Sequence, residues 1–543
     1  MRPAGDRAAL RLLVAAFLLR ALFLDLALPY GDPLDEWFHF AYAQFVSQEG
    51  HLPGPVEPSI AKEFERPGAL LPRSTLFVGM KTTWRELAAL PDTERVARRR
   101  FSYRYVPGDR RTYLFANYET QQPPLFYLLA AGPLALLPES PLDVRLLVVR
   151  VLASILAAAA IVLAYLFFRT LFARRPALAV TAALVAFPAL GSFVGRFTND
   201  ALAVPIIAAM LPFFVRASEG RLTRRRAVIL SLLLAAGLWT KLYVLTLLPA
   251  APIAALLAPR PRRRAAVARS LMAAGAALVV FVPWMLRQHA LSGDWLGLTP
   301  TKEAVLLRLG PMQAVAAAPS LLRLELFGTF ARTFLYPGTW SVMGASSAGA
   351  AALAAGLLLL AAIPALGRTP ATARRRRRWA VGGVAVALFL IGHAAHAAAF
   401  AAIARARGEP IGFGGEGWYV LVLLPVFVAA AAAFGKSVGP RAAALSAALF
   451  LSGEAWMTFG ALPAVYAGAA EPGRVSAATV VTFLMHPRWS LGTFARTGLA
   501  GAPAWLLGAI ATFWLACLGA AIGLLLRRLS AAAVASRPAA ENF

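Results

Sequence analysis

The sequence predicts an all-α polytopic membrane protein with about twelve transmembrane helices. Three observations support this fold class. Of the 543 residues, 59% are hydrophobic and only 15% are charged, unlike the composition of soluble globular proteins. Apolar runs of about 20 residues, the length that crosses a bilayer, recur along the chain. Arginines gather in short blocks between those runs, as they do in the cytoplasmic loops of membrane proteins.

The first apolar run, residues 8–29, is predicted to be a retained transmembrane helix rather than a cleaved signal peptide. Its start is basic, but no clear small-x-small cleavage site follows, and Arg20 interrupts the apolar region. The other spans are predicted from apolar runs between Arg clusters. They cover approximately residues 144–168, 177–195, 201–216, 226–241, 242–258, 268–287, 344–366, 379–400, 418–435, 441–460 and 503–526.

The basic blocks between these spans all fall on one side of the membrane. The positive-inside rule makes that side cytoplasmic and places both termini there. The blocks are Arg174 with Arg175, residues 221–226, 260–264 and 374–378, Lys436 with Arg441, and Arg527 with Arg528.

Three long segments then lie on the opposite, non-cytoplasmic side: residues 30–143, 288–343 and 461–502. We expect one polytopic domain over residues 1–543, with these segments as its external loops. The first loop holds 14 of the 26 acidic residues. Its Pro and Gly residues, together with short amphipathic pieces, predict interfacial helices rather than a folded sheet domain.

The composition also limits which classes of partner the protein can have. A net charge of +28 would suggest nucleic acid in a soluble chain. Here the arginines are topology signals, so we expect membrane lipids as partners and no nucleic acid. The single cysteine, Cys517, lies in an apolar run, which excludes a disulfide framework and a thiolate metal site. No pair of histidines has convincing zinc spacing.

The densest acidic cluster, "GDPLDEWFHF" at residues 31–40, comes directly after the first span. A carboxylate at a membrane face is costly to bury unless it is used, which favours a functional role for Asp35 and Glu36. One carboxylate can face an acceptor hydroxyl while the other faces a metal or a donor phosphate. The alternative is solvated charge that ends a helix. His39 lies in the same cluster.

A second acid lies in the loop "GRFTNDALA" between the third and fourth spans. The loop is so short that Asp200 must lie at the same membrane face as Asp35. Acids from two external loops can converge on one site, and Asn199 would then lie there too. The alternative is that Thr198, Asn199 or Asp200 simply caps the fourth helix.

Other motifs lie at the same face. The segment "NYETQQPPLFYLL", residues 117–129, is interpreted as a structural kink at the interface because of its two prolines. Lys241, in an otherwise apolar stretch, is predicted either to snorkel to lipid headgroups or to receive a lipid-linked phosphate. The remaining candidates are Arg287, Asp294, Glu416 and Tyr419.

The order of these motifs resembles that of the bacterial polytopic glycosyltransferases of the GT-C superfamily. This is the group that includes protein mannosyltransferases, aminoarabinose transferases and Rgt-type lipopolysaccharide sugar transferases. Each motif is weak alone, and the shared order across roughly residues 30–430 carries the resemblance. The matching pieces are "PLDEWFHFAYAQFVSQEGHLP", "QQPPLFYLL", "FTNDALA", "GLWTKLYVLTLLP", "WMLRQHALSGDWLG" and "GWYVLVLLP".

The resemblance implies a GT-C-like helical bundle in the inner membrane. It implies an enzyme that moves a sugar from a polyprenyl-phosphate carrier to a lipid, glycan or protein acceptor at the non-cytoplasmic face. Asp35 maps to the catalytic base, with Glu36 beside it, and Asp200 to a residue that assists in acceptor or metal binding. The expected substrate-binding residues are His39, Asn199, Lys241, Arg287, Asp294, Glu416 and Tyr419.

The expected mechanism is a single displacement with inversion. Asp35 takes the proton of the acceptor hydroxyl while Lys241 and Arg287 hold the leaving phosphate. A divalent cation bridging Glu36 or Asp200 to that phosphate is compatible with this mechanism but not required by it. A secondary transporter and a flippase or polysaccharide-export subunit stay open as other classes. The acids in external loops favour transfer, because transport does not need them.

The chain departs from the family pattern at several positions. Gln122 replaces a His before the two prolines, and His289 follows Gln288 where Asn usually follows Arg. Trp295 replaces a Pro, and Trp418 replaces an Arg that could hold the donor phosphate. The last change leaves the identity of the substrate open.

Overall fold

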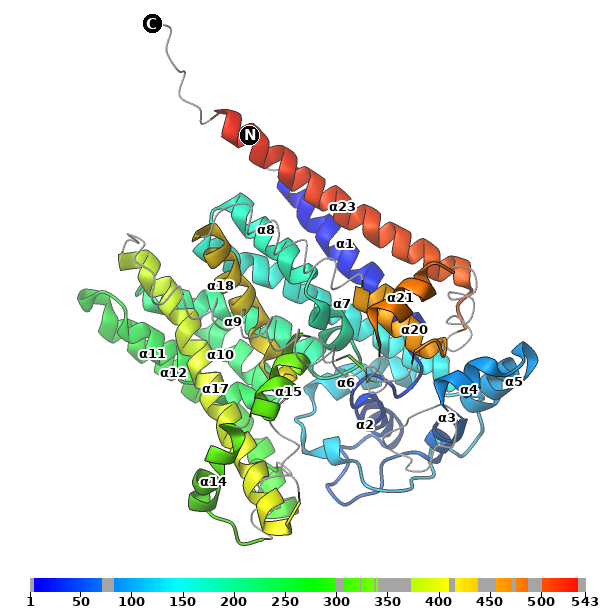
Figure 1. Cartoon of the computed structure of the whole chain (residues 1–543). Helices are drawn as coiled ribbons and strands as arrows, with labels where there is room; N and C mark the ends of the chain where they lie inside the picture. Colours follow the sequence, from blue (N-terminus) through cyan, green and yellow to red (C-terminus); the bar gives the residue numbers. More distant parts are fainter. Residues whose placement is uncertain are drawn as a thin grey trace, which may run out of the picture.

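A computed structural model describes the chain as an assembly of helices (Figure 1). The described part contains only isolated β-bridges and no β-strand, which confirms the predicted all-α class. The described residues are 4–70, 83–297, 307–322, 324–335, 338–339, 373–409, 416–437, 456–470, 475–486 and 501–535.

Helices long and apolar enough to cross a membrane confirm that this is a membrane protein. The predicted total of about twelve spans is not confirmed, because only five helices in the described ranges meet both criteria. They are α7 (Leu142–Leu171), α9 (Asp200–Ser218), α12 (Arg260–Ser292), α17 (Ala373–Arg407) and residues 504–521 of α23 (Ala504–Ala535).

Other predicted spans form helices that do not meet both criteria or that are broken. Two of them are continuous, α1 (Ala4–Ala27) and α10 (Arg224–Leu238). Prolines explain the breaks, because proline lacks the N–H that continues a helix. Pro188 separates α8 (Arg174–Val185) from the π-helical η3 (Leu190–Val194). Elsewhere, η4 (Leu242–Leu247) precedes α11 (Ala250–Leu256), and η6 (Gly417–Leu423) precedes α18 (Leu424–Ser437).

The predicted span 344–366 and the first part of span 441–460 lie outside the described residues. The end of the latter is described as η7 (Met457–Ala461), which leads into α20 (Leu462–Tyr466). Other short helices of the C-terminal half are α14 (Pro311–Ala317), η5 (Ala318–Leu322), α15 (Leu324–Leu335) and α21 (Ala477–Leu484).

The long segment 30–143 folds into short helices, as the sequence predicts for its amphipathic pieces. In Figure 1, α3, α4 and α5 lie together at one end of the molecule, and α6 packs against α2 and α7. The helices are α2 (Glu36–Glu49), η1 (Lys62–Phe64), α3 (Glu65–Leu70), α4 (Trp84–Ala89), α5 (Asp92–Tyr103), η2 (Tyr118–Gln121) and α6 (Leu125–Ala135).

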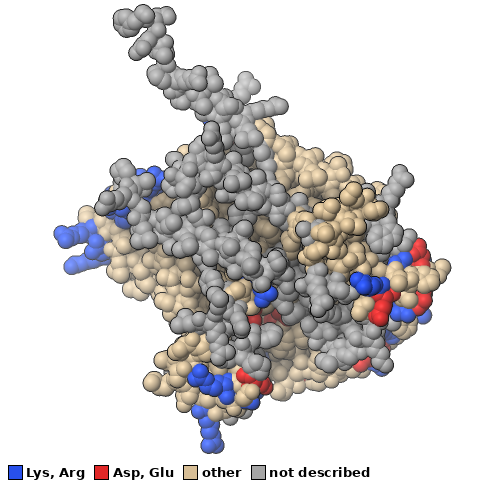
Figure 2. All heavy atoms as spheres, viewed as in Figure 1, with Lys and Arg blue, Asp and Glu red and all other residues tan. Residues whose placement is uncertain are grey.

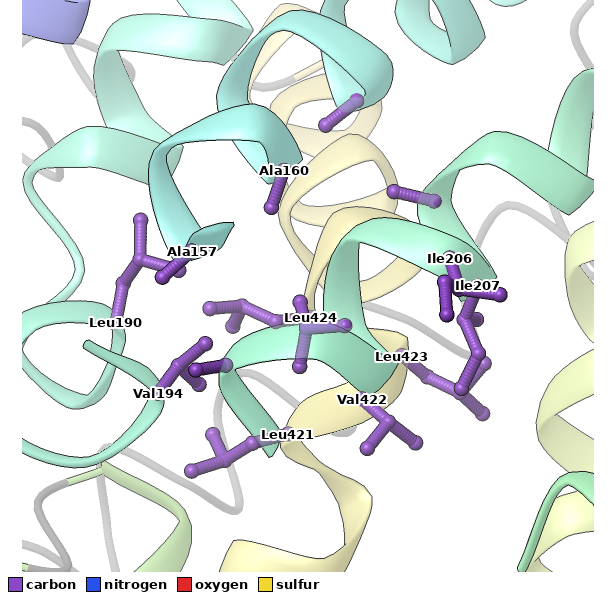
Figure 3. Packing of buried hydrophobic residues seen from close by; sticks show 14 of the residues in the cluster. Ala157, Ala160, Leu190, Val194, Ile206, Ile207, Leu421, Val422, Leu423 and Leu424 are labelled. Atoms are coloured by element: carbon purple, nitrogen blue, oxygen red, sulfur yellow. The ribbon is translucent and has the colours of Figure 1, made fainter. Parts of the chain in front are cut away.

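The core lies where α7, α9, η3 and η6 meet (Figure 3). Ala157 and Ala160 on α7 are fully buried, and side chains this small let neighbouring helices approach closely. Leu421 and Leu424 fill the space from the η6 side. Helix α23 runs beside α1, so the two ends of the described chain pack together (Figure 1).

A buried arginine on α7 joins this core to the first loop. Arg150 donates to the carbonyls of Asp25 and Leu28 at 2.8 and 2.7 Å, near the C-terminal end of α1. The same guanidinium binds Glu36 at the start of α2. The end of α1 and the start of α2 are therefore held in one place on α7.

Candidate active site

Asp35 precedes α2 in a backbone conformation that is rare for aspartate. Its φ and ψ are 59° and 7°, in the left-handed region. Such residues are uncommon outside glycine, and they gather at functional sites. Asp35 occupies the N-cap position, yet its side chain makes no capping hydrogen bond. The half-buried carboxylate is therefore not used to end the helix, which argues against the solvated helix-end alternative.

The turn before Asp35 depends on close packing. Gly31 has φ of +76°, and a Cβ there would lie 1.5 Å from Nε1 of Trp37. Trp37 is buried against the ring of Tyr30, with centroids 3.9 Å apart. Only glycine fits at this turn, so the turn and the first residues of α2 form one rigid unit.

The contacts of Glu36 indicate a structural role rather than a catalytic one. Nε and Nη2 of Arg150 donate to its two carboxylate oxygens, each at 2.7 Å, and both side chains are fully buried. A carboxylate held this way has little freedom to accept a substrate proton or bind a metal. The geometry does not support the predicted catalytic and metal-binding roles of Glu36.

A further carboxylate at this site, Glu119, belongs to the proline-containing segment 117–129. Glu119, on η2, is 5% exposed, and its Oε2 lies 3.5 Å from Oη of Tyr127. Tyr127 in turn lies 2.8 Å from Nδ1 of His39. Asp35 and Tyr118 lie within electrostatic reach of Glu119. Asp35, Glu119 and His39 thus belong to one polar cluster.

The surroundings shift the pKa of each ionisable group in this cluster. Burial raises the pKa of Asp35, and the charge of Asp200 adds to the rise, while Tyr118 and Lys241 oppose it. Burial and the charge of Asp35 raise the pKa of Glu119 to about 8. Burial lowers the pKa of His39 well below its usual value, so the ring is neutral.

Asp200, the first residue of α9, is 3% exposed and is paired across the site. Its Oδ2 accepts from Nζ of Lys241 at 2.5 Å, and its Oδ1 accepts from Oη of Tyr243 at 2.5 Å. Nζ of Lys241 also lies 5.0 Å from the centre of the Tyr243 ring. Lys241 is therefore held by the site rather than extended toward lipid headgroups.

Neither Asn199 nor Asp200 acts as a simple helix cap. Asn199 has helical φ and ψ at the N-cap position and makes no side-chain capping hydrogen bond. Its Nδ2 lies 3.4 Å from Oε1 of Gln122 and from the carbonyl of Thr240. Its Oδ1 is buried with no hydrogen-bond partner among the residues that the structure describes.

Tyr419 joins the cluster from η6. It lies within electrostatic reach of Asp35, Glu119 and Glu416. Its ring lies beside the imidazoles of two histidines on α17, His393 at 5.5 Å and His396 at 5.8 Å between centroids. Glu416, at the start of η6, is buried.

Arg287 and Asp294 lie around the end of α12. Nη2 of Arg287 donates to the carbonyls of Leu52 and Pro53 at 3.1 and 3.0 Å. Its Nη1 is buried and has no partner in the described part of the chain. Asp294 accepts from the backbone N–H of Gly297 at 2.5 Å, which closes the turn after the helix. The contacts of Asp294 are thus those of a turn residue.

The predicted metal ligands are not grouped as a metal site. Glu36 is paired with Arg150 and Asp200 with Lys241. Within the described ranges, no three His, Cys, Asp or Glu side chains lie close enough together to hold an ion. We therefore assign no metal ligand.

The arrangement brings together a carboxylate that does not cap its helix, Asp35, and a cation, Lys241. Asp35 can accept a proton because its carboxylate is not used as a cap. Lys241 supplies positive charge where low solvent exposure strengthens attraction to an anion. The site can therefore deprotonate a hydroxyl while it holds a phosphate.

One comparison with known proteins matches part of the chain to a protein family. Residues 121–286 match the family model described as dolichyl-phosphate-mannose-protein mannosyltransferase. The match includes Asp200 and Lys241. It supports the resemblance to the GT-C superfamily, and it covers under half of the chain.

Solved structures with similar folds have low sequence identity. ArnT from Cupriavidus metallidurans, bound to undecaprenyl phosphate, is 14% identical, with a TM-score of 0.45 over 93% of this chain and 77% of that chain. The Archaeoglobus fulgidus oligosaccharyltransferase tethered to an acceptor peptide is 14% identical, with a TM-score of 0.39 over 89% and 57%. Its apo form is 13% identical, with a TM-score of 0.40 over the same shares. No curated protein matches the sequence.

Proposed function

We propose that this chain is a membrane glycosyltransferase that transfers a sugar from a polyprenyl-phosphate donor to a hydroxyl of a lipid, glycan or protein acceptor. The main support for this proposal is the position of Asp35. This residue has left-handed backbone angles at the N-cap of α2, its carboxylate does not cap the helix, and Lys241 acts on it electrostatically. The matched family is described by a polyprenyl-type donor, dolichyl-phosphate mannose, which supports the donor class.

In the proposed reaction the acceptor oxygen attacks the anomeric carbon of the donor sugar. The bond from that carbon to the phosphate oxygen breaks with inversion, and the acceptor proton moves to Asp35. The polyprenyl phosphate leaves with the bonding electrons. Lys241 neutralises the developing charge, and the unpartnered Nη1 of Arg287 is a second donor for phosphate.

We place this site on the non-cytoplasmic side of the inner membrane. The Arg blocks between spans support that orientation. The two ends of the molecule also differ in charge (Figure 2). Acidic and basic side chains occur together over the end that carries α4 and α5, whereas Lys and Arg occur without visible acids near α11.

A reconstituted transfer assay tests the proposal. Purified protein should transfer sugar from polyprenyl-phosphate mannose or another polyprenyl-phosphate sugar, and it should ignore the matching nucleotide sugars. Transport without transfer would favour the flippase alternative. Robust transfer from a nucleotide sugar, in the absence of lipid carrier, would overturn the proposed donor class.

A further inference from the structure

Several buried polar atoms near the end of α12 have no hydrogen-bond partner among the described residues. They are Nε1 of Trp284, Nη1 of Arg287, and both Nε2 and Oε1 of Gln288. Trp284 and Gln288 are each only 1% exposed. A buried donor or acceptor without a partner costs free energy, and native proteins contain few of them. Their concentration at one end of one helix indicates that a polar ligand completes these hydrogen bonds.

The three side chains are neighbours on the surface of α12. Trp284 lies three residues before Arg287 and four before Gln288, and side chains at both spacings meet on a helix. The guanidinium of Arg287 lies 5.2 Å from the centre of the Trp284 ring, as this spacing requires. Trp284 is therefore the shared neighbour of Arg287 and Gln288.

This end of α12 lies next to the candidate active site. The ring of Trp284 lies 6.3 Å from the ring of Trp239, which comes two residues before Lys241. On the other side, Arg287 is held by the two backbone carbonyls after α2 described above. The atoms without partners thus lie between the loop that follows α2 and the segment that carries Lys241.

A turn covers Gln288 in this conformation. A Cβ at Gly297 would lie 2.3 Å from Oε1 of Gln288, so the backbone of the turn packs directly on the carboxamide. The turn runs from Gly293 to Gly297, whose φ angles are 72° and 70°. Small residues at the ends of a loop can absorb a change in backbone direction. A ligand therefore reaches Gln288 when this turn shifts.

We propose that Gln288 and Trp284 form the subsite for the sugar of the lipid donor. The inference rests on the proposed function, in which Arg287 is a second donor for the phosphate. The sugar is bonded directly to that phosphate, so its hydroxyls lie close to Arg287 and to the neighbours of Arg287. Gln288 can both donate and accept hydrogen bonds, and Trp284 donates one. This uncharged set fits the hydroxyls of a sugar rather than a second anion.

The stability of a variant separates a ligand-binding carboxamide from a structural one. In Gln288→Met an unbranched apolar side chain replaces two buried atoms that have no partner, so the melting temperature should equal or exceed that of the wild type. A melting temperature several degrees lower, or a variant that does not fold, would show that the carboxamide stabilises the fold and would overturn its assignment to the sugar. Trp284→Phe keeps an aromatic ring and removes the N–H, and it supplies the second variant.

Binding to the purified full chain in detergent, measured by titration calorimetry, tests the subsite. The probes are bare polyprenyl phosphate and its mannose, glucose, galactose and arabinose forms. In the wild type, the best sugar form should bind at least about tenfold more tightly than the bare lipid. Gln288→Met and Trp284→Phe should each lower this ratio by about fivefold, while the Kd of the bare lipid stays within about twofold. Arg287→Met should weaken the binding of both probes.

Ser270→Ala is the matched control. Ser270 is fully buried on the same helix, and its Oγ has no partner in the described part of the chain. It lies about 27 Å from Gln288 along the helix axis, so this variant should keep the wild-type ratio. A loss as large as that in Gln288→Met would indicate a general effect on α12 and would overturn the subsite.

The remaining outcomes separate this inference from the proposed function. An unchanged ratio in Gln288→Met and Trp284→Phe, an equal loss for both probes, or a wild type that prefers no sugar form would overturn the sugar subsite. In each of these cases the chain still binds a polyprenyl phosphate, so the proposed donor class stands. A wild type that binds neither bare polyprenyl phosphate nor any of its sugar forms would instead refute the proposed function.

Discussion

The Glu36 carboxylate and the Arg150 guanidinium form a fully buried two-bond pair, with both donor–acceptor distances at 2.7 Å. Arg150 extends from a long apolar helix, and Glu36 is the residue directly after the proposed base. The pair therefore fixes where α2 begins and, with it, the direction in which Asp35 faces. The two adjacent acids thus have different surroundings: Glu36 is paired with an arginine, and Asp35 is the residue for which we propose a chemical role.

Arg150→Met should destabilise the protein strongly. It leaves the Glu36 charge buried without its partner, which typically costs about 3–5 kcal/mol. Adding Glu36→Gln should recover part of the loss, because the amide carries no charge. Thermal unfolding in detergent measures both. The control is Arg98→Met, which breaks the exposed Arg98–Glu94 pair and should change stability by less than about 1 kcal/mol. Equal losses in both single variants would contradict the reasoning.

Asp35→Asn should lower turnover by about 100-fold or more while the protein still folds, because the amide keeps the size but cannot take a proton. The comparison is Glu49→Gln in the same helix, whose carboxylate is exposed and hydrogen-bonds to Tyr113. That variant should be nearly silent. Steady-state transfer rates, normalised to folded protein, measure the difference. Similar effects from both would favour solvated charge at this position.

The orientation of the first loop can be checked by cysteine labelling. Val56 is 86% exposed, and the native Cys517 is partly buried. In a Cys517→Ala background, Val56→Cys should react with a membrane-impermeant maleimide in intact spheroplasts. The matched site on the cytoplasmic side is Arg224→Cys, at the exposed start of α10, which should react only after permeabilisation. The reverse pattern would invert the topology and relocate the proposed site.

The class of fold was predictable from hydropathy, and loop length predicted that Asp35 and Asp200 share a membrane face, in keeping with the electrostatic influence of Asp200 on Asp35. A short loop leaves Asp200 little choice of membrane face, and that constraint is visible in sequence. The partner of Glu36 was not predictable, because Arg150 lies 114 positions away inside an apolar run. The breaks within the predicted spans were not predictable either, because a hydropathy profile does not show that Pro188 or Pro249 interrupts a helix.

Glu119 was missed for a related reason. Its segment shows two prolines and aromatic residues that are typical of a membrane interface, and those dominate the pattern. Glu119 is buried beside His39 and Tyr127, which come from different parts of the loop. The acidic residue four positions before the first proline, flanked by tyrosine, was the available signal.

The raised pKa of Glu119 also predicts how stability depends on pH. Between about pH 4.5 and 8 the unfolded chain has lost this proton while the folded protein retains it. Unfolding then releases a proton, so the stabilisation that Glu119 gives at low pH is lost as pH rises through about 8. Melting temperatures of Glu119→Gln and wild type should differ least near pH 5 and most near pH 9, with the variant favoured. A difference independent of pH would contradict the shift.

The last prediction concerns the donor phosphate. Lys241→Met removes the positive charge next to Asp35 and Asp200, so the apparent KM for polyprenyl-phosphate sugar should rise by more than about tenfold. The KM for the acceptor should change much less. The single variant also leaves Tyr243 as the remaining side-chain donor to the buried Asp200 among the described residues, and this unbalanced charge destabilises the fold. Asp200→Asn combined with Lys241→Met removes both charges and should restore stability without restoring donor binding.

Lys62→Met, at an exposed position in the first loop (residues 30–143), is the charge-matched control. If the double variant regains donor affinity, Lys241 holds Asp200 rather than phosphate, and the cation for the leaving group must be sought at Arg287.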